Sequence, residues 1–100
     1  MNKYNIQLTD GFKKDAKRLS IQEQALVFKT LDIMRNDPYY QSLRTKKMKG
    51  RRKYQRELFG SRVNNDIRLI WYFDDDCDKI IVMLEVGHHD VEKQRKVQRH

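Results

Sequence analysis

The segment with sequence VGHHD, residues 86–90, holds the side chains best suited to chemistry. His88 and His89 are adjacent, Asp90 follows them, and the one other histidine of the chain is His100. An imidazole has an unperturbed pKa of about 6.5, so a histidine can give or take a proton near neutral pH. The segment is therefore a candidate acid–base site, a candidate metal site, or a pair of solvated side chains at the end of a strand.

The run IIVMLEV before this segment predicts a strand, in which adjacent side chains point to opposite faces. Only one of the two histidines can then face a cleft. The more continuous apolar row is predicted to face the helices; it comprises Ile80, Val82, Leu84 and Val86. His88 has the parity of this row, whereas His89 has the parity of Met83 and Glu85 on the open face.

A metal site at VGHHD is not expected. Adjacent histidines on a strand do not converge easily on one ion, and no suitable third ligand lies near them in the sequence. Asp90 can orient an imidazole or accept a proton, but as an N-cap of the segment that follows it has a simpler role. We therefore expect no metal and no cofactor.

Two helices are predicted after a short N-terminal strand in which apolar and polar residues alternate. Thr9 or Asp10 can cap the first helix, and Ser20 with Glu23 has the spacing of a capping box for the second. Pro38 ends the second helix, since the residue before a proline disfavours helical geometry. The first helix has one apolar face, made of Phe12, Ala16 and Leu19. The second has an apolar stripe of Val27, Leu31 and Met34, which Leu26 and Phe28 widen.

Strand patterns follow in residues 54–59, 65–73 and 80–86, and the acidic turn DDDCDK joins the last two as an antiparallel hairpin. The predicted fold is α+β, with a small antiparallel sheet of mixed edge: an N-terminal strand, a two-helix hairpin on one face, then three strands. Gly50 is predicted to be a bend between the helices and these strands. Residues 1–100 are expected to form a single domain, with residues 91–100 a mobile basic tail.

The charge balance favours a polyanionic partner such as nucleic acid. Lys and Arg number 22 against 14 Asp and Glu, a net charge of +8. Between Leu43 and Arg56 there are eight basic residues and no acidic one. No apolar run approaches the roughly 18 residues of a membrane span, and no membrane partner is expected. The single cysteine, Cys77, cannot form an internal disulfide, which fits a reducing cytoplasm.

The order of these elements resembles the RelE/ParE superfamily of toxins from type II toxin–antitoxin pairs. The residues that carry the likeness are YNIQLTDGFKKDAKRL, DPYYQSLRTKKMKG, RVNNDIRLIWYFDDD and IIVMLEVGHHD, and it extends to about Asp90. The RelE type is favoured because of the basic run LRTKKMKG and the strand end VGHHD. The resemblance implies a cytoplasmic, ribosome-dependent endoribonuclease (an mRNA interferase) that binds the ribosome, mRNA and a cognate antitoxin. The alternatives left open are a ParE-like inhibitor of DNA gyrase and a non-toxic basic binding module.

The resemblance also implies roles for single residues. His89 occupies a position where family members carry a functional arginine or histidine, and His88 is a supporting or second catalytic residue. Arg62 resembles a phosphate-stabilising arginine, and Lys49 is a candidate for proton transfer. A larger set is expected to bind RNA: Lys46, Lys47, Lys49, Arg51, Arg52, Tyr54 and Arg68.

The chain departs from the family after Asp90. Many RelE-like toxins carry an aromatic residue there that can stack on a base, whereas residues 91–100 contain none. A stacking residue must then come from elsewhere, such as Tyr54 or Phe59.

Overall fold

The computed structural model describes residues 3–53, 55–74 and 77–88, and for residues 49, 51–53, 77 and 78 it describes the backbone alone. The tail expected at residues 91–100 lies outside this range. Within it the elements follow in this order: β1 (Asn5–Leu8), α1 (Asp10–Lys17), α2 (Ile21–Asn36), the 3-10 turn η1 (Gln41–Leu43), β2 (Lys46–Lys53), β3 (Arg56–Arg62), β4 (Ile67–Asp74) and β5 (Cys77–His88).

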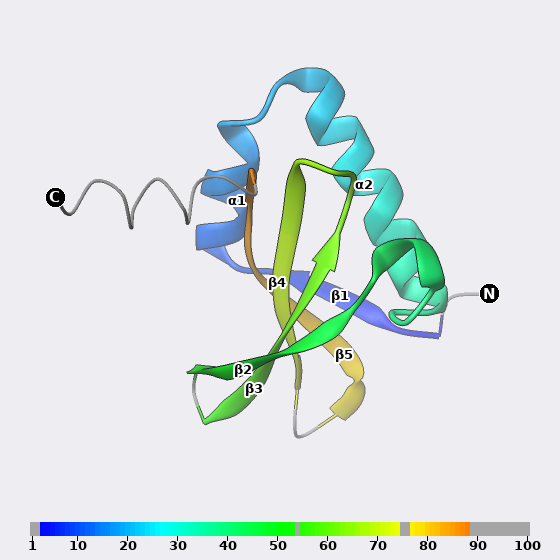
Figure 1. Ribbon diagram of the computed structural model, residues 1–100, viewed down its shortest axis with the longest axis vertical. Coiled ribbons are helices and arrows are strands. Elements are labelled where there is room, and N and C mark those ends of the chain that lie inside the picture. The colour runs from blue at the N-terminus through cyan, green and yellow to red at the C-terminus, as the bar shows by residue number, and fades with distance from the viewer. Residues whose placement is uncertain (1–2, 54, 75–76, 89–100) are drawn as a thin grey trace, which may run out of the picture.

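The strands form one sheet in the order β1-β5-β4-β3-β2, shown in Figure 1. The first strand pairs in parallel with β5, and the other neighbours are antiparallel. The predicted α+β class, the mixed edge and the β4–β5 hairpin are confirmed. One strand was missed, because the basic segment is strand β2 and four strands follow the helices instead of three.

Strand β2 escaped prediction because its residues do not alternate between apolar and polar types. It lies at the sheet edge and pairs with β3 alone, and edge strands commonly carry charges, which discourage pairing with other chains. The pairing register shifts between Lys47 and Arg52. Gly50 lies inside this irregularity with a φ of 76°, so the predicted bend is a distortion within a strand.

Both helices begin at the predicted caps. The Thr9 side chain accepts a hydrogen bond from the Phe12 amide at 3.2 Å and donates one to the Met83 carbonyl at 2.8 Å, which ties the start of α1 to β5. Ser20 and Glu23 form the complete capping box of α2. Helix α2 ends at Asn36, two residues before Pro38, as expected.

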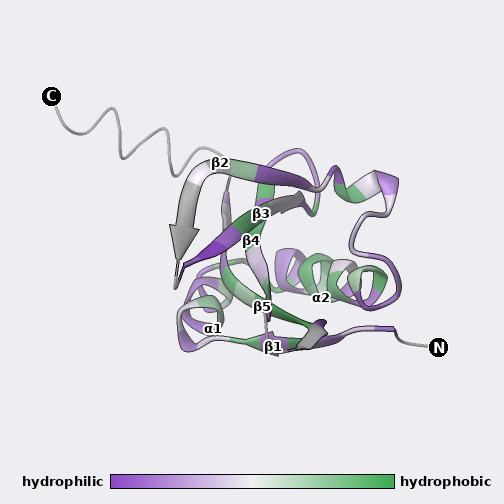
Figure 2. Cartoon of the chain, turned by 90° about the horizontal axis from the view of Figure 1, so that it is seen from below, coloured by the Kyte–Doolittle hydropathy of each residue, from purple (hydrophilic) through white to green (hydrophobic). Residues whose placement is uncertain are grey.

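The two helices and one face of the sheet enclose the main core. Figure 2 shows α2 beside the strands, with hydrophobic residues concentrated along β5. The predicted helix positions are buried: Phe12, Ala16, Leu19, Val27, Leu31 and Met34. They pack against β4 through Ile67, Leu69 and Trp71. Leu26 and Phe28 were expected to widen the stripe of α2, but they are 43% and 47% exposed.

Strand β5 contains a bulge that changes which side chains face the helices. Ile70 pairs with Glu85, but the next residue, Trp71, pairs with Met83, so one residue of β5 is extra. Before the bulge, Ile81 and Met83 face the main core. The prediction that Ile80, Val82 and Leu84 face the helices, with Met83 on the open side, is therefore wrong.

After the bulge, the predicted parity holds. Val86 lies in the main core, and His88 pairs with the core residue Ile67, so both are on the helix side. Leu84 instead joins a second, smaller apolar cluster on the open face, with Leu58 and Ile70. Because of the bulge, the side chains of Val86 and His88 are on the helix side of the sheet, whereas that of Leu84 is on the open face.

Candidate functional site

A groove of ≈ 660 Å³ lies at the end of the sheet where β2 and β4 begin and where β3 and β5 end. Residues from α1 and from these four strands line it. The basic lining residues are Arg18, Arg44, Lys46, Arg62 and Arg68, the acidic ones are Asp15 and Glu85, and His88 lies at the end of β5. Its apolar lining includes Met48 and Ile70 on the open face of the sheet.

Arg62 and Arg68 are direct partners across β3 and β4, so their side chains leave the same face of the sheet. Burial lowers the pKa of Arg68, and the neighbouring charge of Arg62 lowers it further. The Arg68 guanidinium donates hydrogen bonds to the carbonyl oxygens of Asn64 and Asn65, at 3.0 and 3.2 Å. Arg68 therefore holds the β3–β4 turn, and Arg62 extends beside it.

Arg44 joins these two arginines at the same place. It follows η1 in a left-handed conformation with a φ of 49°, which is uncommon for a residue with a side chain. Within the described part of the chain, none of the three arginines forms a salt bridge with a carboxylate. Neighbouring cations that lack an ion-pair partner repel one another, and a bound anion would reduce this repulsion.

A chain of hydrogen bonds fixes the strands beneath Arg44 and Arg62. Trp71 Nε1 donates to Ser61 Oγ at 2.9 Å, Ser61 Oγ lies 2.6 Å from Thr45 Oγ1, and the Thr45 hydroxyl donates to the Pro38 carbonyl at 2.7 Å. Because Thr45 follows Arg44 and Ser61 precedes Arg62, this chain sets the relative position of the two arginines. Ser61 and Trp71 are buried, so the bond between them lies in the core.

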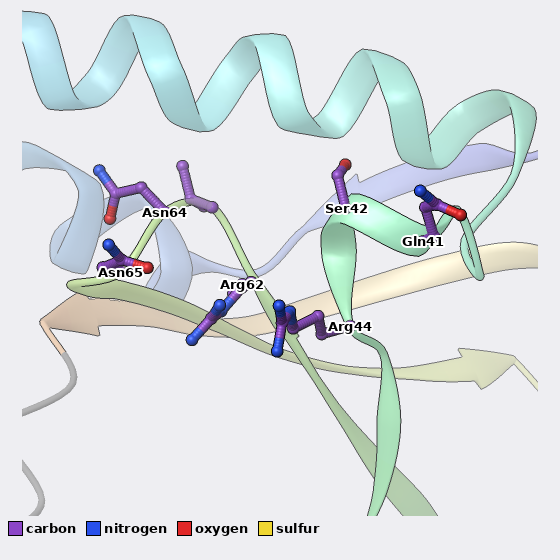
Figure 3. Close-up of a pocket in the computed structure, with 7 residues that line it drawn as sticks. Gln41, Ser42, Arg44, Arg62, Asn64 and Asn65 are labelled. Atoms are coloured by element: carbon purple, nitrogen blue, oxygen red, sulfur yellow. The ribbon is translucent and has the colours of Figure 1, made fainter.

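A second pocket, of ≈ 640 Å³, lies on the other side of the same two arginines, between η1 and the β3–β4 turn. Figure 3 shows the side chains of Arg44 and Arg62 close together at its edge. The remaining lining residues are Gln41, Ser42, Val63, Asn64 and Asn65, none of which is acidic. The two pockets therefore share a pair of cations.

His88 is held by a contact with the second helix. Its Nε2 lies 2.8 Å from Glu23 Oε2, while Glu23 Oε1 accepts the capping hydrogen bond from the Ser20 amide. The bond with His88 is the main reason that the pKa of Glu23 is lowered. The Val86 amide donates to Asp15 on α1 at 3.3 Å, so both helices anchor the end of β5.

The structure brings four of the predicted site residues to one groove: Lys46, Arg62, Arg68 and His88. Lys47 lies elsewhere. It pairs with Phe59, whose side chain is in the main core, and forms a salt bridge with Glu57 at 3.2 Å. Phe59 is buried and stacks on Trp71 at 4.8 Å between ring centroids, so it is not available to stack on a base.

The other predicted residues cannot be placed in this way. Lys49, Arg51 and Arg52 belong to β2, of which only the backbone is described at these positions. Tyr54 and His89 lie outside the described residues, so the parity argument that separates His89 from His88 remains a prediction.

Four charged lining residues were not singled out as site residues from the sequence: Asp15, Arg18, Arg44 and Glu85. Arg44 was one of eight basic residues in an unbroken run, and nothing in its type distinguished it from the others. Glu85 was assigned to the open face only as a parity marker for His89. Its position on the open face agrees with the predicted parity, which holds after the bulge.

In the range that the structure describes, no group of three or more His, Cys, Asp or Glu side chains could hold a metal ion. Among the same residues, no helix has the length and apolar character needed to cross a membrane.

No protein-family model and no curated protein matches the chain, but solved structures do. One is the archaeal RelE–RelB complex from Pyrococcus horikoshii, with a TM-score of 0.70 and 19% identity over 89% of this chain and 98% of the other. The RelBE2 toxin–antitoxin complex from Mycobacterium tuberculosis matches with a TM-score of 0.66 and 21% identity, over 86% and 98%. The Escherichia coli DinJ–YafQ toxin–antitoxin complex matches with a TM-score of 0.65 and 16% identity, over 87% and 93%.

These matches cover nearly the whole of each solved chain, and they join the same two helices to the same kind of five-stranded mixed sheet. They confirm, at the level of the fold, the resemblance read from the sequence. The chain has the fold of the RelE-like toxins.

Proposed function

We propose that this chain is the toxin of a toxin–antitoxin pair and that it is an endoribonuclease acting on mRNA at the ribosome. Two of the matched structures are named as toxin–antitoxin complexes. The observation that carries the proposal is the cluster of Arg44, Arg62 and Arg68, three cations at the rim of one groove with no carboxylate paired to them among the described residues. A phosphodiester fits this cluster, because a guanidinium binds phosphate oxygens through two parallel hydrogen bonds.

In the proposed reaction, a base removes the proton of a ribose 2′-hydroxyl, and its oxygen forms a bond to the adjacent phosphorus. The bond between phosphorus and the 5′-oxygen of the next nucleotide breaks, and an acid protonates that oxygen. The products are a 2′,3′-cyclic phosphate and a free 5′-hydroxyl. Neither a metal nor another cofactor is required by this scheme.

The proposed roles rest on the chemistry of the side chains and, for Arg62, Arg68 and His88, on their places in the groove. Arg62 stabilises the negative charge that develops on the phosphate, and Arg68 supports it from the neighbouring strand. His89 and Lys49 transfer the protons. His88, held by Glu23, fixes the end of β5 immediately before His89. The RNA backbone is bound by further residues: Lys46, Arg51, Arg52 and Tyr54.

The partners of the proposed toxin are the ribosome, mRNA and a cognate antitoxin. A ribosome that holds mRNA in a defined path can supply much of the positioning that the reaction needs, so few catalytic side chains suffice. An antitoxin must neutralise the toxin while it is not needed. We expect a small acidic protein, encoded next to this chain, to copurify with it and to restore growth when both are produced.

A translating extract with a defined mRNA tests the nuclease directly. We expect the purified protein to cut that mRNA when it is being translated and Arg62→Ala to cut it about 100-fold more slowly, the usual effect of losing one donor to a developing anion. Lys29→Ala is the matched control, because it removes an exposed cation of α2 that does not line the groove. Cleavage by the control should equal that of the parent protein.

Intact mRNA in this assay, together with growth arrest in cells, would contradict the nuclease. Inhibition of DNA supercoiling by purified gyrase would then assign the arrest to the ParE-like activity instead. Absence of growth arrest would leave only a basic binding module.

A further inference from the structure

We infer that the pocket between η1 and the β3–β4 turn binds a purine nucleotide of the RNA strand, next to the nucleotides held in the groove. This inference rests on the proposed function and adds to it a base preference. The pocket shares Arg44 and Arg62 with the groove, so a strand whose phosphate contacts these two arginines has one neighbouring nucleotide on each side of them.

The pocket suits an anion with a polar ring attached. Its volume of ≈ 640 Å³ lies in the range of small-molecule sites, roughly 300 to 1,000 Å³. Two cations, three carboxamides and a hydroxyl line it, and no carboxylate does. The groove differs in this respect, since it includes Asp15 and Glu85.

The carboxamides have the donors and acceptors that a purine edge requires. Gln41 and Asn65 are exposed, and their side-chain amides have no hydrogen-bond partner among the described residues. Asn64 Oδ1 accepts from the amides of Asp66 and Ile67, so its NH₂ group is left to donate. Adenine presents the acceptor N7 beside the donor N6, the pair that a Gln or Asn amide matches with two hydrogen bonds.

The wall of the pocket is held in place, which a selective site needs. The Asn64 side chain closes its own turn, and Arg68 binds the carbonyl oxygens of Asn64 and Asn65. On the opposite wall, Thr45 and Ser61 link the segment after η1 to β3. These bonds hold the β3–β4 turn and fix the segment after η1 against β3.

Binding of short RNA to the purified chain, without ribosomes, tests the pocket separately from cleavage. The probes are fluorescent hexanucleotides of adenosine, of 7-deazaadenosine, which lacks the N7 acceptor but stacks alike, and of uridine. We expect the adenosine hexamer to bind about fivefold more tightly than the other two. The double variant Gln41→Ala/Asn65→Ala should lose this preference and retain its affinity for the uridine hexamer.

The matched control is Gln7→Ala/Gln22→Ala, which removes two exposed carboxamides distant from the pocket lining. It should keep the preference for adenosine. Equal binding of adenosine and 7-deazaadenosine by the parent chain would overturn the inference, as would a preference that survives in the pocket variant. So would failure to bind any hexamer at about 0.1 mM, the weak limit of non-specific affinity.

The two proposals fail in different ways. An adenosine preference without any cleavage of translated mRNA would refute the nuclease and leave the pocket as an RNA-binding site. Cleavage of translated mRNA without an adenosine preference would refute the pocket alone.

Discussion

The positions of three side chains favour an anionic ligand: Arg44, Arg62 and Arg68. Each has a structural reason for its position: a left-handed residue after η1, the last residue of β3, and the residue that holds the β3–β4 turn. Their common location nevertheless concentrates like charge; the pKa of Arg68 is lowered first by burial and then by the neighbouring charge of Arg62. An anion that binds only the folded chain would reduce the repulsion between these charges and raise its stability.

Ser61 precedes Arg62 and its hydroxyl contacts Thr45, the residue after Arg44. We expect Ser61→Ala to lower the free energy of unfolding by about 1 to 3 kcal/mol, because it leaves the buried Trp71 indole N–H without its partner. It also removes the contact with Thr45, so the relative position of Arg44 and Arg62, which line both pockets, should become less fixed. Urea unfolding followed by tryptophan fluorescence measures the first effect.

Ser42→Ala is the control for that measurement, since it removes a hydroxyl from an exposed serine of η1. Its stability should stay within about 0.5 kcal/mol of the parent. A Ser61→Ala variant as stable as the control would show that the hydrogen-bond chain contributes nothing to the fold.

At the scale of elements, the contact between Glu23 and His88 joins α2 to the end of β5. The pKa of Glu23 is lowered from 4.5, mainly by His88 and next by the capping bond with Ser20. A carboxyl group whose pKa is lower in the folded chain contributes stability that is complete above its unfolded value and is lost as the pH falls through the folded value. The contribution of Glu23 should therefore disappear on acidification below 4.5.

A comparison with Glu23→Gln isolates this contribution from those of other carboxyl groups. The variant should be less stable than the parent at about pH 5.5, and the difference should shrink toward pH 3. In addition, His88→Gln should raise the pKa of Glu23 toward 4.5, as followed by the NMR shift of its carboxyl carbon. An unchanged pKa in that variant would mean that the capping box alone perturbs Glu23.

The elements also show what a sequence can and cannot specify. The helix ends were predictable because caps are local: Thr9, Ser20 and Glu23 act on residues within one turn of themselves. The core stripes were predictable from periodicity. Strand β2 was not, since a charged edge strand is defined by its one neighbour and not by its own pattern.

The site was harder to predict than the fold. The bulge at Leu84 depends on the pairing of β5 with β4, and it moves every assignment of side chains before it to the other face. The sequence therefore indicated the correct side for His88 and the wrong one for Met83. Arg44 comes beside Arg62 and Arg68 only because β2 pairs with β3 and β3 with β4.

At the scale of the whole molecule, the net charge of +8 should dominate encounters with nucleic acid. Four cations line the groove from β2, β3, β4 and the segment after η1: Arg44, Lys46, Arg62 and Arg68. If each neutralises one phosphate of single-stranded RNA, the logarithm of the binding constant should fall with the logarithm of salt concentration with a slope of about −3.

Removing one of these cations should reduce the slope by about 0.7, whereas Lys29→Ala should leave it unchanged. Fluorescence titrations of a uridine hexamer at several salt concentrations give the slope directly. A slope near zero would mean that the groove binds RNA without phosphate contacts, which contradicts the part assigned to the arginines.

The position of β5 has a consequence for the time at which the groove forms during synthesis of the chain. Among the described strands β5 is the last in the chain, yet it lies inside the sheet, between β1 and β4. Asn5 pairs with Ile80, and the Thr9 side chain donates a hydrogen bond to the Met83 carbonyl. More than 70 residues separate the two members of each pair, and contacts between residues so far apart in the sequence form late in folding. While a ribosome is still synthesising the chain, β1 has no partner, the core lacks Ile81 and Met83, and the groove lacks its rim at Gly87 and His88. Unfinished chains that lack β5 thus carry the arginines without the site, and the groove forms only after β5 has been synthesised.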